Sequence, residues 1–199
     1  MAVPRPLARS ELPIDTASLA RDLIGKVLVR ESPEGAASGR IVETEAYGIG
    51  DAAGHAYRGM TERNRSLFLE PGRAYVYLAY GVSSMLNVSS EAPGIGAGVL
   101  IRALEPLEGL AVMRRNRGVE RLRDLARGPG RLAAALRIDR SLNGLDLCRQ
   151  GPLWLGVDDH EPGEIGQSVR IGISRDAERL LRFYLRGSAF VSGPRSLNE

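Results

Sequence analysis

The chain contains very little cysteine, histidine or lysine, and each shortage excludes a class of chemistry. The single cysteine, Cys148, excludes an internal disulfide framework. The two histidines, His55 and His160, lie far apart, so the sequence offers no spaced set of metal ligands. We therefore expect neither a metal nor a cofactor. The only lysine is Lys26, which leaves arginine to supply nearly all of the positive charge.

Long hydrophobic runs are also missing. No apolar stretch is long enough to span a bilayer, and residues 1–16 contain prolines and charges where a signal peptide would have an apolar centre. We therefore expect a soluble cytoplasmic protein that has no membrane partner. With 199 residues, 43% of them hydrophobic, the chain suffices for one well-packed domain and is short for two. We predict a single monomeric domain, 1–199, that begins with an irregular arm over residues 1–15.

Residues 39–47, Gly-Arg-Ile-Val-Glu-Thr-Glu-Ala-Tyr, form the most informative strand pattern in the chain. Side chains alternate between the two faces of a strand, so Glu43, Glu45 and Tyr47 share one face. Two carboxylates and a phenol therefore point the same way. A solvated edge strand would explain the charges as well as a functional site would.

A second strand pattern, residues 99–104, bears on that choice. Its apolar run is interrupted by Arg102, and a buried guanidinium is costly without a partner. We expect that partner to be Glu43 or Glu45, which would make the interruption part of a site.

Three of the six tyrosines lie within residues 75–80, in a predicted strand. Gly81 and the serines after it favour a turn, and residues 85–89 suit the returning strand of a hairpin. Tyrosine has an apolar ring and a polar tip, which suits a surface that meets a nucleic-acid base. Tyr77 and Tyr80 are therefore candidates for stacking or wedging, whereas we expect Tyr75 to pack.

The remaining patterns complete an α+β fold. Helices are predicted over residues 16–23, with Asp15 or Thr16 as the cap, over 107–116, with Pro106 in the first turn, and over 129–138; a short segment at 62–69 follows Thr61. Strands are predicted at 26–31, 168–173 and 180–186, with residues 139–168 rich in turns. Because the strands come in hairpins and the longer helices are grouped, we predict a curved, largely antiparallel sheet flanked by helices.

Seven arginines are concentrated between residues 114 and 131: Arg114, Arg115, Arg117, Arg121, Arg123, Arg127 and Arg131. Arginine forms planar, bidentate contacts with phosphate, so the cluster suits nucleic-acid binding. A solvated helical face would explain it equally well.

Taken together, the motifs resemble those of the alkyladenine (3-methyladenine) DNA glycosylases of mammals and many bacteria. They follow the family's order from Gly39 to Ser188 and comprise Gly39-Arg-Ile-Val-Glu-Thr-Glu-Ala-Tyr47, Arg63-Asn-Arg65, Tyr75-Val-Tyr77 with Tyr80-Gly81, Asn87-Val-Ser-Ser90, Leu100-Ile-Arg-Ala-Leu-Glu-Pro-Leu-Glu-Gly109, Gly128-Pro-Gly-Arg-Leu132 and Arg182-Phe-Tyr-Leu-Arg-Gly-Ser188. An ordered series of this kind is far more specific than any one motif.

The resemblance implies a compact domain that binds double-stranded DNA, inserts a protruding β-hairpin, flips a damaged purine out and hydrolyses its N-glycosidic bond. By motif position, Glu45 resembles the general base that activates water, and Arg102 resembles the arginine that helps to hold that water. A backbone carbonyl of the tail, at Ile171 or Ile173, is expected near the same water. Glu43 matches no catalytic role and is expected to be structural.

The base-binding residues are carried over in the same way. Tyr47, His55 and Tyr77 resemble the residues that enclose the flipped base, although the mammalian relatives have one more residue between the first two. Tyr80 resembles the residue that fills the vacated stack, with Val82 where those relatives have a methionine. Asn87 resembles the residue that discriminates against guanine.

Two other classes remain open beside the glycosylase. A non-catalytic nucleic-acid-binding domain could use the same tyrosines and arginines, but it would not need a carboxylate beside a buried arginine. A glycosidase for free nucleosides should lack both the basic stretch and the exposed aromatic hairpin.

Overall fold

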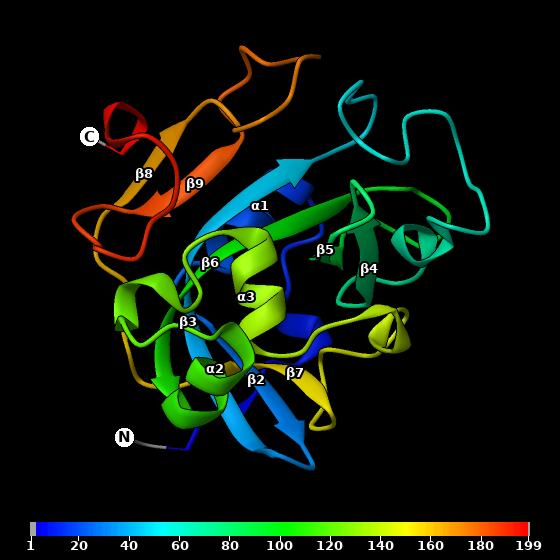
Figure 1. The fold of residues 1–199 in the computed structure, drawn as a ribbon. Helices are drawn as coiled ribbons and strands as arrows, with labels where there is room; N and C mark the ends of the chain where they lie inside the picture. The colour runs from blue at the N-terminus through cyan, green and yellow to red at the C-terminus, as the bar shows by residue number, and fades with distance from the viewer. Residues whose placement is uncertain (1–2, 199) are drawn as a thin grey trace.

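The computed structural model describes residues 3–198, in which nine strands form one antiparallel sheet (Figure 1). Along the main path the order is β1 (Arg5–Pro6), β7 (Leu153–Val157), β2 (Val27–Ser32), β3 (Gly35–Tyr47), β6 (Gly98–Glu108), β5 (Ser83–Ser89) and β4 (Ala74–Ala79). Beside this path, β9 (Arg182–Leu185) pairs with β3 and with β8 (Ile165–Ser168). The predicted α+β class with an antiparallel sheet is confirmed.

Strand β3 is the centre of the sheet. One of its edges pairs with β6 over most of its length, and the other pairs first with β2 and then with β9. Its hairpin with β2 was predicted. Glu43 and Glu45 have no exposed surface, so the interpretation of residues 39–47 as a solvated edge strand is wrong.

Helices lie on both sides of this sheet. α1 (Thr16–Asp22) is capped by Asp15, whose carboxylate accepts hydrogen bonds from the N–H groups of Ala17 and Ser18. It lies behind β3 and β6, whereas α3 (Pro129–Ala135) lies across β5 and β6 in front, next to α2 (Leu110–Arg117) (Figure 1). Their apolar side chains share one main core with those of the sheet. In the described chain, no helix has the length and apolar content to cross a membrane.

Two predicted elements around Pro106 and Ser168 need correction. Pro106 is not in a helix, because β6 continues to Glu108 opposite β3, and Gly109 turns the chain with a φ of 69° before α2 begins. Strand β8 ends at Ser168 rather than beginning there. The chain then leaves the sheet, and Arg170 is buried in an ion pair with Asp51.

Smaller differences concern segment lengths. Only a short 3₁₀ helix, Arg65–Phe68, forms in the segment predicted at 62–69, and α3 ends three residues before Ile138. The turn-rich region contains β7, in which Trp154 is buried against Val27 and Val29. Within the arm, β1 pairs with β7 and a 3₁₀ turn spans Arg9–Glu11, so the arm is partly regular.

Strands β4 and β5 form a hairpin whose tip is Tyr80-Gly81. Both tip residues have positive φ, 50° and 72°, and the N–H of Val82 donates to the carbonyl of Ala79 at 3.0 Å. This is the pattern of a type I′ turn, which places Tyr80 in the turn and not in the strand. Tyr80 is 95% exposed. A tyrosine that is both solvated and in the left-handed region is unusual, and such strain often marks functional sites.

Candidate active site

A buried network of carboxylates and guanidinium groups lies between β3 and β6. Arg102 on β6 donates from Nε to Oε1 of Glu43 at 2.8 Å, and its Nη1 lies 3.2 Å from Oε1 of Glu45. The sequence predicted one of these carboxylates as the partner of Arg102, and the structure shows both. The β3–β6 register shifts on either side of Glu43, and such irregularities re-aim side chains.

Glu43 is held by three donors. Beside Arg102, Arg182 donates from Nε to Oε1 at 2.7 Å, and the N–H of Ser192 donates to Oε2 at 2.7 Å. Burial acts to raise the pKa of Glu43, but the two guanidinium groups and Ser192 outweigh it and hold that pKa below its usual value. Glu43 is therefore an ionised anchor that fixes the guanidinium of Arg102 beside Glu45.

The two oxygens of Glu45 differ in their surroundings. Oε1 accepts the N–H of Ile171 at 2.7 Å and also faces Arg102, whereas Oε2 accepts the hydroxyl of Tyr47 at 2.9 Å. Burial and the charge of Glu45 raise the pKa of Tyr47, so its phenol stays protonated and donates. A carboxylate oxygen accepts two hydrogen bonds. Oε2 accepts one bond from the described residues, and so it retains a free acceptor position.

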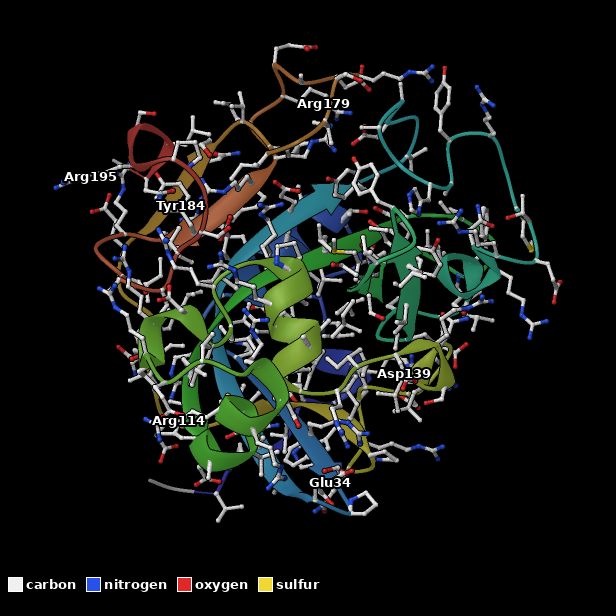
Figure 2. All side chains as sticks on the ribbon, viewed as in Figure 1. Glu34, Arg114, Asp139, Arg179, Tyr184 and Arg195 are labelled. Atoms are coloured by element: carbon white, nitrogen blue, oxygen red, sulfur yellow. The ribbon has the colours of Figure 1, made fainter. Side chains whose placement is uncertain are left out.

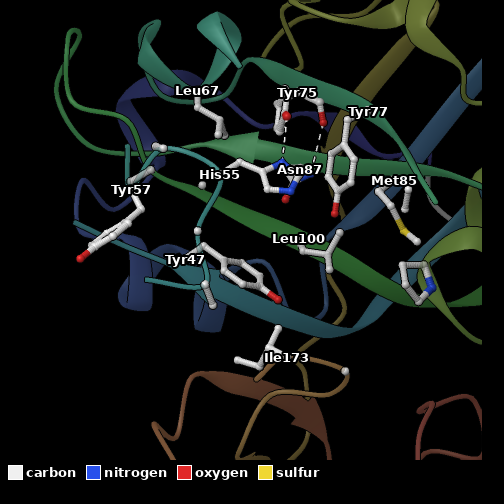
Figure 3. A pocket seen from close by; sticks show the side chains of 18 of the residues that line it. Tyr47, His55, Tyr57, Leu67, Tyr75, Tyr77, Met85, Asn87, Leu100 and Ile173 are labelled. Carbon is white, nitrogen blue, oxygen red and sulfur yellow. Dashed lines mark hydrogen bonds between the residues drawn. The ribbon is translucent and has the colours of Figure 1, made fainter. Parts of the chain in front are cut away.

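A cavity of about 390 Å³ opens next to this network. Tyr47 lies on one side, and His55 and Tyr77 lie across from it, as Figure 3 shows. Leu100 and Arg102 contribute from β6, and Ile171 and Ile173 contribute from the segment after β8. The size, and walls that include five tyrosines and a histidine, suit one small planar ligand.

His55 is fixed by two tyrosines on β4. Its Nδ1 lies 2.9 Å from the hydroxyl of Tyr75, and its ring meets that of Tyr77 edge-on with 4.3 Å between centroids. Burial and the positive charge of Arg63 lower the pKa of His55, so the imidazole is neutral near pH 7. Tyr75, expected to pack, is buried and is a wall of the cavity at the same time.

Asn87 on β5 is the amide of this cavity. It is 7% exposed, and its Nδ2 donates to the carbonyl of Tyr75 at 3.3 Å (Figure 3). Tyr80 reaches the cavity only at the rim. Tyr57 on the same loop as His55 is half-exposed, and its ring points away from the other labelled side chains in Figure 3. The structure therefore assembles Glu45, Arg102, Tyr47, His55, Tyr77 and Asn87 at one site, with Tyr80 at its mouth.

The sequence did not predict two residues of this site, Arg170 and Asp51. The guanidinium of Arg170 lies 4.6 Å from the centroid of the Tyr47 ring, donates to the carbonyl of Ala46 and is ion-paired with Asp51. It covers one face of Tyr47 by a cation–π contact. The available signal was the arginine that interrupts the apolar run Val169–Ile173, which resembles the position of Arg102 in its own strand.

Aromatic walls, a neutral imidazole and a buried, ion-paired carboxylate with one free acceptor position meet at a site that suits a planar heterocycle. The sequence profile of the methylpurine-DNA glycosylases matches residues 10–189. The chain is 80% identical over 194 residues to a protein of Mesorhizobium japonicum, covering 98% of this chain and 93% of that one. It is 55% identical to a protein of Paraburkholderia phytofirmans (96% and 90% covered) and 47% identical to one of Methanoculleus marisnigri (89% and 94%). All three carry the provisional name 3-methyladenine DNA glycosylase.

The chain thus belongs to the methylpurine-DNA glycosylase family. It is a hydrolase of DNA repair whose substrate is DNA, which confirms the enzyme class and the family predicted from the motifs. The non-catalytic domain and the nucleoside glycosidase are both ruled out by this membership.

Proposed function

We propose that the enzyme flips an alkylated or deaminated purine into the aromatic cavity and hydrolyses its N-glycosidic bond. The substrates are of the 3-methyladenine, 7-methylguanine, hypoxanthine and ethenoadenine class, of which 3-methyladenine is the base that the relatives' names give. The observation that carries this proposal is Glu45, fully buried beside Arg102 and bonded to Tyr47, a wall of the cavity. The product is an abasic site, which starts base excision repair.

Flipping is required because the glycosidic bond is inaccessible within the base stack. The flipped purine lies between Tyr47 on one side and His55 and Tyr77 on the other. Arg170 covers the back of Tyr47, which leaves the opposite face of the ring to stack on the base. Asn87 occupies the place toward which the 2-amino group of guanine would point, and it rejects that base by clash or by burying an unpaired polar group.

Water is the nucleophile, and Glu45 is its general base. Oε2 of Glu45 takes the proton, because Oε1 is already occupied by the N–H of Ile171 and by Arg102. Arg102, whose Nη1 lies 3.2 Å from Oε1 of Glu45, helps to hold the water. Positive charge develops on the sugar as the bond breaks, and the carboxylate stabilises it.

Tyr80 occupies the gap that the flipped nucleotide leaves in the duplex. The type I′ turn holds this ring in solvent at the end of a rigid hairpin, near the mouth of the cavity. Unstacking a base step costs a few kcal/mol, which an inserted side chain offsets in part.

The proposed reaction needs no amine nucleophile. A lyase that cuts the strand would form a Schiff base with a lysine of lowered pKa. Lys26, the only lysine, lies next to β2 and is ion-paired with Asp22 at 3.6 Å. We therefore propose a monofunctional glycosylase. Since one chain supplies all the groups of the site, the monomer is the active unit.

The test is a set of matched duplexes, each carrying one of the four lesions, incubated with the protein under single-turnover conditions. We expect release of a free base from at least one duplex, strand breakage only after alkali, and no borohydride-trapped protein–DNA adduct. Excess undamaged duplex should compete. Absence of base release from all four would contradict the proposed substrate class, and a trapped adduct would contradict the monofunctional reaction.

A further inference from the structure

A second cavity, of about 460 Å³, lies away from the aromatic one. It is formed by the segments 123–127 and 185–198, and we call it the basic cavity because three arginines line it: Arg123, Arg127 and Arg195. Figure 2 shows Arg195 on the side of the molecule formed by the C-terminal segment. No part of the reaction proposed above uses this cavity.

The positive charge in the basic cavity is not balanced. The four buried arginines of the described chain, Arg40, Arg102, Arg170 and Arg182, each form an ion pair with a carboxylate. Among residues 3–198, no carboxylate forms an ion pair with any of the three arginines of the basic cavity. The solvated-helix explanation does not apply here either, because α2 ends at Arg117.

Backbone carbonyls orient two of these guanidinium groups. Arg127, which is half-buried, donates from Nε to the carbonyl of Val191 at 2.7 Å, and Arg123 donates from Nε to that of Ala189 at 2.9 Å. Their terminal amino groups have no hydrogen-bond partner among the described residues. Burial and the charges of Arg123 and Arg131 outweigh those of Asp124 and Glu43 and lower the pKa of Arg127. The arrangement is therefore prepared for an anion.

Two short stretches of chain link the basic cavity to the active site. Arg127 is two residues from Pro129, which lines the aromatic cavity. Val191 precedes Ser192, whose N–H holds Glu43. Short stretches of chain therefore connect the walls of the two cavities, and a DNA strand is an extended ligand that could contact both.

We propose that the basic cavity binds a backbone phosphate of the duplex whose flipped nucleotide enters the aromatic cavity. This inference rests on the proposed function, because it takes the flipped nucleotide as the other anchor. The planar guanidinium groups of Arg123 and Arg127 present paired N–H donors that match phosphate oxygens. The phosphodiester supplies the negative charge that the cavity lacks.

The test is the salt dependence of binding to an undamaged duplex. Each phosphate contact contributes about 0.9 to the slope of log Kd against log salt. Arg127→Gln should lower that slope by about 0.9, so that binding is about eightfold weaker at 0.1 M salt if both proteins bind equally at 1 M. Arg195→Gln should act in the same direction, and because the side chain of Arg195 is exposed, this variant should fold as the unmodified protein does.

The matched control is Arg137→Gln, which removes the same charge from an exposed arginine that already pairs with Glu34. An unchanged slope in both cavity variants, or the same change in the control, would overturn the proposal. A second measurement tests whether the ligand is a free anion: binding of inorganic phosphate is monitored by ³¹P line broadening. If Arg127→Gln abolishes the broadening but leaves the slope for DNA unchanged, the cavity binds a free anion and the proposal is overturned.

The same experiment separates this inference from the proposed function. Binding to an undamaged duplex does not depend on excision, so a slope that decreases in a protein that releases no base would support the phosphate site and contradict the proposed reaction.

Discussion

Replacing Glu43 by glutamine should destabilise the fold strongly, although Glu43 takes no part in the proposed chemistry. The exchange keeps the shape of the side chain but removes the charge shared by Arg102 and Arg182. Arg102 would retain Glu45, whereas Arg182, which is fully buried, forms its ion pair in the described chain with Glu43. The amide nitrogen would in addition point a donor at groups that are themselves donors.

Breaking a buried ion pair on one side costs about 3–5 kcal/mol. A domain has a total stability of only about 5–15 kcal/mol. For a chain of this length, 1 kcal/mol corresponds to about 2–4 °C in Tm. Glu43→Gln should therefore lower the Tm by about 6–20 °C.

The assay is thermal unfolding followed by circular dichroism, with Glu62→Gln as the matched control. Glu62 forms an ion pair with Arg65 at 2.8 Å, as short as that of Glu43 with Arg102, but its side chain is 86% exposed. Exposed pairs contribute about 0–1 kcal/mol, so the control should shift the Tm by no more than about 4 °C. Equal shifts in the two variants would refute the assignment of Glu43 as the anchor of the network.

The pH dependence provides a second check on Glu43. Because its pKa is lowered in the folded protein, the folded state binds fewer protons than the unfolded state below the ordinary value of 4.5. Its contribution is therefore present above pH 4.5 and lost as the pH falls through the lower, folded-state pKa. The difference between the unmodified protein and Glu43→Gln should shrink in that acidic range.

Three further predictions concern the aromatic cavity and its mouth. Tyr80→Ala should weaken binding to lesion duplexes more than Tyr75→Ala, and should spare excision from single-stranded DNA, where no gap needs filling; an equal loss on single strands would exclude the wedge role. Asn87→Ser should raise the excision rate for 7-methylguanine relative to hypoxanthine in matched duplexes, and an unchanged ratio would leave the amide a structural role. The pKa of His55 is lowered in the folded protein, so below the ordinary value of 6.5 the unfolded state binds more protons than the folded state. The free energy of unfolding should therefore decrease as the pH is lowered below 6.5. His55→Gln should remove that part of the slope in urea titrations, whereas replacement of His160, which does not line the cavity, should not.

The sequence was most informative where local patterns and pairing agree. The strand pattern of residues 39–47 located β3 and the apolar run of residues 99–104 located β6, and the guanidinium of Arg102 inside that run correctly predicted a buried carboxylate partner. The turn signal at Gly81 located the hairpin. The turn signal could not place Tyr80 at the tip of the hairpin, because tyrosine does not favour the left-handed backbone conformation. The pairing of β4 with β5 holds Tyr80 in that conformation.

Other features depend on contacts that no local pattern records. Proline favours the first turn of a helix, but the pairing of β3 with β6 extends past Pro106 and keeps it in a strand. Arg170 and Asp51 are 119 residues apart, and their pairing behind Tyr47 follows only from the folded chain. The resemblance to a known family supplied the roles of Glu45 and Asn87, and the basic cavity became visible only once the C-terminal segment was placed beside residues 123–127.

The most direct test of the account is single-turnover excision by Glu45→Gln on the lesion duplex that the enzyme processes best. Glutamine keeps the contacts with the N–H of Ile171 and with Tyr47 possible but cannot accept a proton from water. General base catalysis contributes about 10²–10⁴ in rate, so excision should fall by at least about a hundredfold, while the Kd for the lesion duplex stays within a few-fold of the unmodified value. Excision at a near-normal rate, with binding unchanged, would contradict the assignment of Glu45 as the base and with it the proposed mechanism.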